Sequence, residues 1–191
     1  MGSSYVANPL IFLIDTFFSL YILAVMLRFL LQWVNADFYN PICQLIVKIT
    51  HPPLKILRRA IPAIGRIDTA SLVLLLLLQM ISGWVIFALK GSSSPVEAIF
   101  VWAVMELMGL LINIYVVVIL VQVVLSWVNP GAYNAVTSLI YYLTEPLLGT
   151  VRKLIPPLGG IDFSPLVVLI GLQLVKMVLF PPMVELISLL S

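Results

Sequence analysis

The chain has 191 residues, of which 62% are hydrophobic and 9% are charged, and its formal net charge is +2. A globular domain carries roughly 25% charged residues, so this chain has too few polar groups to cover a water-exposed surface. The composition excludes a soluble enzyme or binding domain and predicts a membrane protein.

Four apolar runs are each long enough to cross a bilayer, which takes about 20 helical residues. They lie near residues 9–34, 70–89, 99–128 and 165–190. Polar residues do not alternate with apolar ones along these runs, as they would in the strands of a membrane β-barrel. The sequence therefore predicts an all-α membrane protein with four transmembrane helices, divided between a first unit of residues 1–94 and a second unit of residues 95–191.

The first run is expected to begin at Pro9, because proline is well tolerated in the first turn of a helix. It ends near Trp33, where an aromatic side chain suits the membrane interface. Arg28 lies five residues before Trp33, close enough for its side chain to snorkel toward the headgroups. We expect Arg28 to be a structural polar residue.

The segment after the first run predicts a short amphipathic helix that lies in the membrane interface or dips shallowly into it. Its apolar side chains recur at the spacing of one helical face: Ile42, Leu45, Ile46 and Ile49. His51 and the pair Pro52 and Pro53 are expected to end this helix, since proline breaks the helical hydrogen-bond pattern. A second short piece follows, and its polar side carries Lys55, Arg58 and Arg59. We interpret the whole segment as an elbow whose basic residues dock anionic lipid, at about 1 kcal/mol per residue, or a protein partner.

The chain contains an internal repeat, in which residues 50–72 return as residues 144–166, 94 positions later and without a gap. Ten residues of the first copy are identical in the second: Thr50, Pro52, Leu54, Arg58, Ile61, Pro62, Gly65, Ile67, Asp68 and Leu72. The second elbow carries Arg152 and Lys153. Repetition at a fixed offset indicates two copies of one folding unit. Each unit holds two membrane helices, so we expect the units to share one orientation about a pseudo-twofold axis along the membrane normal, unlike inverted repeats.

The second membrane helix of each unit is expected to open at an aspartate and to carry a glutamine at its centre. Asp68 and Asp162 stand at the helix starts, where a carboxylate favours the positive end of the helix by roughly 0.3–1 kcal/mol. Gln79 and Gln173 follow eleven residues later, roughly 16 Å into a core about 30 Å thick. We expect both amides to point inward, because an amide facing lipid is costly. Pro181 and Pro182 are expected to kink or stop the last helix.

Basic residues concentrate in the two elbow segments. Residues 35–69 and 129–163 hold seven lysines and arginines between them, whereas Lys90 alone lies in the connection between the units. By the positive-inside rule, we expect the elbows in the cytoplasm and both termini and the 90–98 connection outside.

No catalytic group, cofactor site or metal site is predicted. His51 is the only histidine and Cys43 the only cysteine, so neither a triad nor a metal cluster has its parts. Ionisable residues within the apolar runs include Asp15, Arg28, Glu106 and Lys176. None has a charged counterpart in the other unit, which favours snorkelling or structural pairing over a transport role.

Several motifs resemble the YggT family. In the first unit they are residues 28, 32–33, 37–41, 50, 52, 58–59, 61–62, 65, 67–68 and 70–71. In the second unit they are residues 152, 155–156 and 159–165. The resemblance covers nearly the whole chain and implies a bacterial inner-membrane protein with two copies of the family domain. Bacterial relatives are associated with osmotic and ion homeostasis or with cell-division genes, and plastid relatives with cytochrome assembly and nucleoid distribution. The resemblance supplies no catalytic residue, and a single histidine gives no support to a haem role.

Our leading hypothesis is a non-enzymatic membrane scaffold or assembly factor that acts through its cytoplasmic elbows. Its expected partners are the lipid bilayer, anionic lipid at the cytoplasmic face, and a homo-oligomer or a membrane protein, with no nucleic acid. The alternative is a pore or transport component in osmotic or potassium balance. Four helices with so few polar groups are unsuited to enclose a wet path alone, so the alternative requires an oligomer.

Overall fold

The computed structural model describes residues 3–65, 67–92, 94–129, 131, 134–156 and 162–190. These residues form six α-helices and no strand, which confirms the prediction of an all-α protein. The helices are α1 (Ser3–Trp33), α2 (Pro41–Ala60), α3 (Thr69–Leu89), α4 (Val96–Val128), α5 (Ala135–Leu154) and α6 (Ser164–Leu190).

Within these residues, four helices are long and apolar enough to cross a membrane. Their spans are Pro9–Trp33, Thr69–Leu89, Val96–Val128 and Ser164–Leu190. They agree with the four predicted runs, with two corrections at prolines. Pro9 lies inside α1 and not in its first turn, and α6 continues through Pro181 and Pro182 to Leu190 without stopping.

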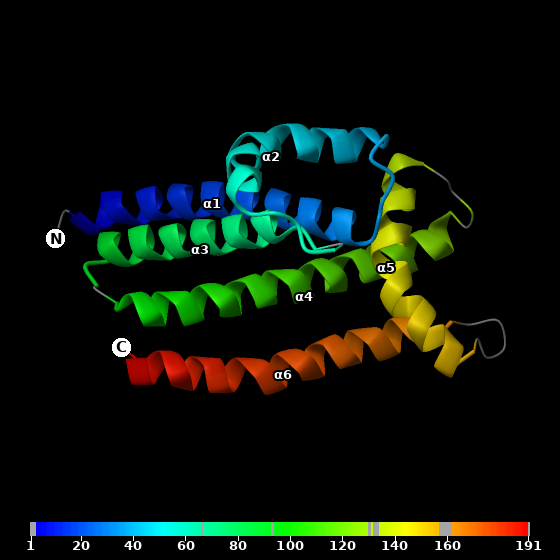
Figure 1. Cartoon of the computed structure of the whole chain (residues 1–191). Coiled ribbons are helices and arrows are strands. Elements are labelled where there is room, and N and C mark those ends of the chain that lie inside the picture. Colours follow the sequence, from blue (N-terminus) through cyan, green and yellow to red (C-terminus); the bar gives the residue numbers. More distant parts are fainter. Residues whose placement is uncertain are drawn as a thin grey trace.

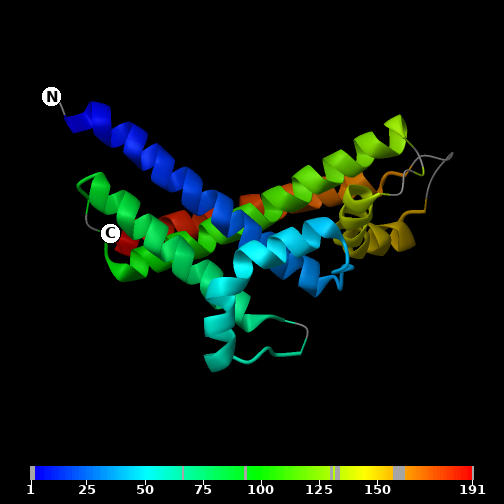
Figure 2. The ribbon, with the colours of Figure 1, turned by 90° about the horizontal axis from the view of Figure 1, so that it is seen from above.

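The four spanning helices run side by side in the view of Figure 1, whereas Figure 2 shows that the pair α1 and α3 crosses the pair α4 and α6 obliquely. α1 and α4 run one way and α3 and α6 the other, so the two units have the same orientation. α2 and α5 lie toward one end of these helices, which we call the elbow end. Both chain termini and the connection between α3 and α4 lie at the opposite end, which we call the terminal end.

The spanning helices pack in a row. α1 packs on α3, α3 on α4, and α4 on α6, with no comparable packing between α1 and α6 among the described residues. The main core is centred on Val25, Leu30, Leu54 and Leu75 of the first unit and extends into α4 and α5 of the second unit. A smaller cluster of Ile119, Leu148 and Val168 holds the second unit together. The units therefore share an internal plan, while α1 and α6 form the two outer edges of the row.

Each elbow is one continuous helix, so the expectation that the prolines end the first elbow helix is wrong. α2 passes through Pro52 and Pro53 and changes direction within its length (Figure 2). A proline at position 53 has no N–H for the carbonyl of Ile49 four residues earlier. The Tyr21 hydroxyl of α1 donates to that carbonyl at 3.5 Å. The hydroxyl of Tyr21 thus replaces the N–H that proline lacks as the donor to the Ile49 carbonyl. The helix therefore bends at the prolines but continues.

A tight turn joins α2 to α3. Ile64 and Ile67 exchange backbone hydrogen bonds of 3.1 and 3.0 Å, and the Thr69 hydroxyl donates to the Pro62 carbonyl at 2.6 Å. Gly65 has a φ of +61°, a left-handed conformation that favours glycine. The turn brings the end of the elbow back to the start of the next spanning helix.

Candidate functional site

The repeated polar residues meet where each elbow joins the following spanning helix. In the first unit, Arg58 Nη2 forms an ion pair with Asp68 Oδ2. In the second, Arg152 Nε lies 2.8 Å from Asp162 Oδ2. The partners are ten residues apart in both units. We call each arginine–aspartate pair a latch, because it ties the last turn of the elbow helix to the beginning of α3 or α6.

The first latch joins an exposed arginine to a buried carboxylate. Asp68 is 2% exposed and also accepts a hydrogen bond from the Ser71 hydroxyl at 2.6 Å. Arg58 Nη2 donates to Gln32 Oε1 of α1 at 3.1 Å as well. Asp68 stands at the N-cap position of α3, but its side chain accepts no hydrogen bond from the helix backbone. Asp68 thus stands at the expected start of α3, but its carboxylate is engaged by Arg58 and Ser71.

The latch sets the ionisation of Asp68. Burial alone would raise the pKa of this carboxyl group, but hydrogen bonds from Arg58 and Ser71 and the positive charge of Arg58 outweigh burial. The pKa of Asp68 consequently lies below its ordinary value. The ionised, latched form is the stable one at neutral pH.

The second latch is more open and has a third member. Asp162 accepts from the Ser164 backbone N–H at 2.8 Å, which confirms its expected place at the start of α6. Arg152 Nη1 also contacts Glu145 Oε2 at 2.7 Å. Burial alone would lower the pKa of Arg152, but its bonds to Asp162 and Glu145 raise it above its ordinary value. Sequence reasoning missed Glu145, since its counterpart in the first unit is His51.

Arg28 is buried, so the expectation that its side chain snorkels toward the membrane surface is wrong. It is 5% exposed, and its Nη1 donates to the Val47 carbonyl at 3.2 Å and to the Thr50 hydroxyl at 2.9 Å. In the second unit, Gln122 stands where Arg28 does and accepts from the Thr144 hydroxyl. Each unit thus uses the same pair of positions to fasten its elbow helix to its first spanning helix, with an arginine in one and a glutamine in the other.

Asn40 connects the two elbows. Its Oδ1 caps α2 by accepting from the Ile42 N–H at 2.9 Å. Its Nδ2 donates to the carbonyl of Ala135, the first residue of α5, at 2.7 Å. The equivalent Asn134 caps its own helix and is exposed, whereas Asn40 is 7% exposed. One amide therefore stabilises one elbow and joins it to the other.

The predicted docking residues divide into two groups. Arg58 and Arg152 are held in the latches. Lys55, Arg59 and Lys153 are exposed, and none of the three has an ion-pair or hydrogen-bond partner within the described residues. Beside the second elbow lies a pocket of about 590 Å³. Its lining includes Tyr141, Tyr142, Thr150, Arg152 and Lys153.

The two central glutamines differ, contrary to expectation. Gln79 is half-buried on the face of α3 that also carries the buried residues Leu75, Ser82 and Ile86. Gln173 is exposed on α6. The prediction that both amides point inward is confirmed for Gln79 and wrong for Gln173. The reason is the row packing, which covers α3 on two sides and leaves α6 at an edge.

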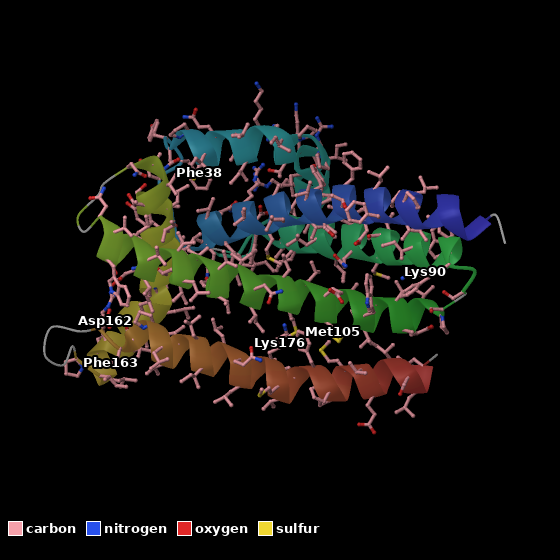
Figure 3. The ribbon with its side chains drawn as sticks, turned by 180° about the vertical axis from the view of Figure 1, so that it is seen from behind. Phe38, Lys90, Met105, Asp162, Phe163 and Lys176 are labelled. Atoms are coloured by element: carbon pink, nitrogen blue, oxygen red, sulfur yellow. The ribbon has the colours of Figure 1, made fainter. Side chains whose placement is uncertain are left out.

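The other ionisable residues of the spanning helices lie toward the surface. Asp15 and Glu106 are exposed, and Lys176 is half-buried with its Nζ 5.4 Å from the centre of the Phe180 ring. Figure 3 shows Lys176 and Met105 between α4 and α6, with Asp162 at the elbow end and Lys90 at the terminal end. In the part of the chain that the structure describes, no three histidine, cysteine or carboxylate groups are placed to hold a metal ion.

Comparison with known proteins identifies the family. The family model described as CCB3/YggT matches residues 7–89 and again residues 101–183, and these starting points differ by 94 residues, the offset of the internal repeat. The chain is 42% identical to an uncharacterised protein of Pseudomonas aeruginosa, over 87% of this chain and 86% of that protein. It is 38% identical to the uncharacterised protein YggT of Escherichia coli, over 89% of this chain and 88% of that protein.

A shorter similarity extends to plastids. The chain is 39% identical to the Arabidopsis thaliana YlmG homolog protein 2, chloroplastic, over 32% of this chain and 24% of that protein. No solved structure matches the chain. The two successive matches to the family model and the bacterial relatives show that this chain is a member of the CCB3/YggT family with two tandem YggT repeats.

Proposed function

We propose that this chain is a non-enzymatic scaffold of the bacterial inner membrane that docks anionic lipid with its two elbows at the cytoplasmic face. The observation that carries the proposal is the division among the basic residues. The latches hold each elbow against its spanning helix, and Lys55, Arg59 and Lys153 remain exposed on the elbows so held. Cytoplasmic lipid is anionic and attracts each such residue by about 1 kcal/mol.

The position of the elbows supports this assignment. Both elbows lie toward the elbow end of the spanning helices, α5 across that end and α2 beside the adjoining half of α1 (Figure 1). The pocket beside the second elbow places Tyr141 and Tyr142 next to Arg152 and Lys153. Aromatic rings beside basic groups suit the interface, where acyl chains end and phosphates begin. Both termini and the 90–98 connection would then lie in the periplasm, in agreement with the bias of basic residues toward the elbows.

Quenching by brominated lipid tests the proposal. Trp33 and Trp127 are exposed near the elbow end and report on nearby acyl chains. We expect brominated phosphatidylglycerol to quench them more than brominated phosphatidylcholine does. The substitutions Lys55→Glu, Arg59→Glu and Lys153→Glu should reduce that preference by about fivefold per charge, most strongly at low salt.

Lys90→Glu is the matched control, since it reverses one exposed charge at the terminal end. It should leave the preference unchanged. Equal quenching by the two lipids at low salt, or equal loss in the control and the elbow variants, would remove the lipid-docking proposal.

A second function has one observation in its favour. Asp15 and Glu106 are acidic groups within the spanning helices, and both are exposed. Ionisable groups at membrane depth commonly mark ion pathways. The alternative is therefore an oligomeric pore or transport-associated protein in osmotic or potassium homeostasis, and ion flux separates it from the scaffold.

A further inference from the structure

α6 is the least covered of the spanning helices. Among its described residues, only Ser164 and Val168 are buried, and both lie in its first turns at the elbow end. α3 and α4, by comparison, are covered by neighbours on both sides of the row. An uncovered apolar face is ordinary in lipid, so exposure alone says nothing about a partner. The polar residues on this face are what distinguish it.

Gln173 lies at the centre of that face. It stands eleven residues after Asp162, roughly 16 Å into the membrane core, and its side chain is exposed with no hydrogen-bond partner among the described residues. Lipid tails offer no donor or acceptor, so an amide left there loses several kcal/mol of hydrogen bonding. The amide of Gln173 needs a partner that this chain does not provide.

A second amide lies at the same depth on α4. A Cβ built on Gly109 would lie 3.3 Å from the Phe180 ring, which sets the register between α4 and α6. Asn113 is four residues beyond Gly109, and Gln173 is seven residues before Phe180. Because the two helices are antiparallel, Asn113 and Gln173 are separated by less than one helical turn along the membrane normal.

Both amides belong to one face of the α4–α6 pair. Asn113 is part of an exposed stripe of α4 that includes Glu106, Asn113, Val117 and Leu120. Residues at these spacings share one side of a helix. Lys176 lies between α6 and α4, and Gln173 is turned about 60° around α6 from it. The stripe is turned around α4 in the same rotational sense from Gly109, which faces Phe180 of α6. Because the two helices are antiparallel, equal rotational senses place Gln173 and the stripe on the same side of the pair. The face therefore presents two unpaired amides within an apolar surface at mid-membrane depth.

We propose that this α4–α6 face binds a second copy of the chain, with the amides of Gln173 and Asn113 as the polar centre of a homodimer. A primary amide both donates and accepts, so it is complementary to another copy of itself. Two copies in one membrane have the same orientation, and a twofold axis along the membrane normal brings Gln173 and its symmetry mate to the same depth. Interhelical hydrogen bonds of this kind stabilise association between membrane helices.

Energy transfer between labelled copies in liposomes tests the dimer. The wild-type chain should show transfer that falls as the protein is diluted in lipid, which gives a dissociation constant. Gln173→Leu should raise that constant by between about threefold and about 18-fold, the range for one interhelical hydrogen bond. Asn113→Leu should act in the same direction. Gln173→Asn keeps an amide on the face and should recover part of the loss.

Gln79→Leu is the matched control, because Gln79 is the repeat counterpart at the same depth but lies on the packed face of α3. It should leave the dissociation constant unchanged, with tryptophan emission confirming that each variant keeps its fold. Oxidation of Gln173→Cys in a Cys43→Ser background should link two copies, and Gln79→Cys should not. A wild-type chain that stays monomeric at every dilution, or a constant unchanged in both Gln173→Leu and Asn113→Leu, would overturn the proposal.

Discussion

In each unit, an arginine and a threonine fix the elbow helix to the neighbouring spanning helices. Arg58 and Arg152 close the latches, while Thr50 and Thr144 fasten the elbow helices to the spanning helices before them. Both threonines are fully buried. The sequence repeat marks all four positions, because it returns each residue 94 positions later.

Removing one latch should destabilise the fold in a pH-dependent way. Asp68→Asn replaces the carboxylate that Arg58 and Ser71 contact, and hydrogen bonds to a charged group contribute about 1.5–3 kcal/mol. The pKa of Asp68 is lower in the folded state, so its contribution is complete above the ordinary aspartate pKa of about 3.9 and is lost as the pH falls through the folded-state pKa. Thermal unfolding in detergent should therefore separate wild type from Asp68→Asn at pH 7 and bring them together in acid.

Asp37→Asn serves as the comparison for this measurement, since Asp37 is exposed and, among the described residues, its carboxylate accepts only from the Tyr39 N–H, at 2.9 Å. It should shift the midpoint little. A difference between wild type and Asp68→Asn that stays constant from pH 7 to pH 3 would contradict the assignment of a lowered pKa to this carboxyl group.

At the scale of the helices, the sequence predicted which segments are long and apolar enough to span a membrane. It did not predict the contacts between these helices. Apolar length gave all four spans within a few residues, because the bilayer imposes that length on any helix that crosses it. The continuity of α2 through Pro52 and Pro53 was not predictable from local pattern, since it depends on Tyr21 from another helix. The exposure of Gln173 was missed for the same reason: repeat symmetry describes a unit, while burial depends on the neighbours that each unit has.

The contact between α3 and α4 joins the two units through a small residue. A Cβ at Gly83 would lie 2.5 Å from the Trp102 ring, which also packs edge-on against Phe87 at a centroid distance of 5.5 Å. Gly83→Ala should force the ring to move and destabilise the chain by about 1–3 kcal/mol. Gly171→Ala is the control, because no atom lies within 4 Å of its Cβ position. Equal unfolding midpoints for the two variants would show that this contact does not join the units.

At the scale of the whole molecule, the elbows are joined to each other as well as to the spanning helices. Asn40→Asp should keep the cap of α2, since aspartate caps as well as asparagine does. It removes the Nδ2 donor to Ala135 and should lower the free energy of unfolding by about 1–3 kcal/mol, because the site is buried. Asn134→Asp keeps a cap on an exposed site and should change stability little. An unfolding free energy for Asn40→Asp equal to that of the wild type would contradict a stabilising bridge from Asn40 to Ala135.

From the sequence, only those residues of the candidate site that recur in both units could be predicted. Repeated arginines and aspartates were recognised, but their pairing across ten residues required the turn that Gly65 makes possible. Glu145 and the bridge from Asn40 to Ala135 have no counterpart in the other unit, so no repeat could reveal them. Basic residues that looked alike in sequence therefore serve two purposes, and only their contacts separate the latches from the exposed docking residues.

Ion flux into liposomes that contain the purified protein tests the central claim of a scaffold most directly. With a scaffold, potassium, sodium and proton flux should stay at the level of protein-free vesicles, at protein densities high enough for association and with or without an osmotic gradient. Flux that is selective, rises with protein density and falls in Asp15→Asn or Glu106→Gln would contradict the account and establish the pore alternative.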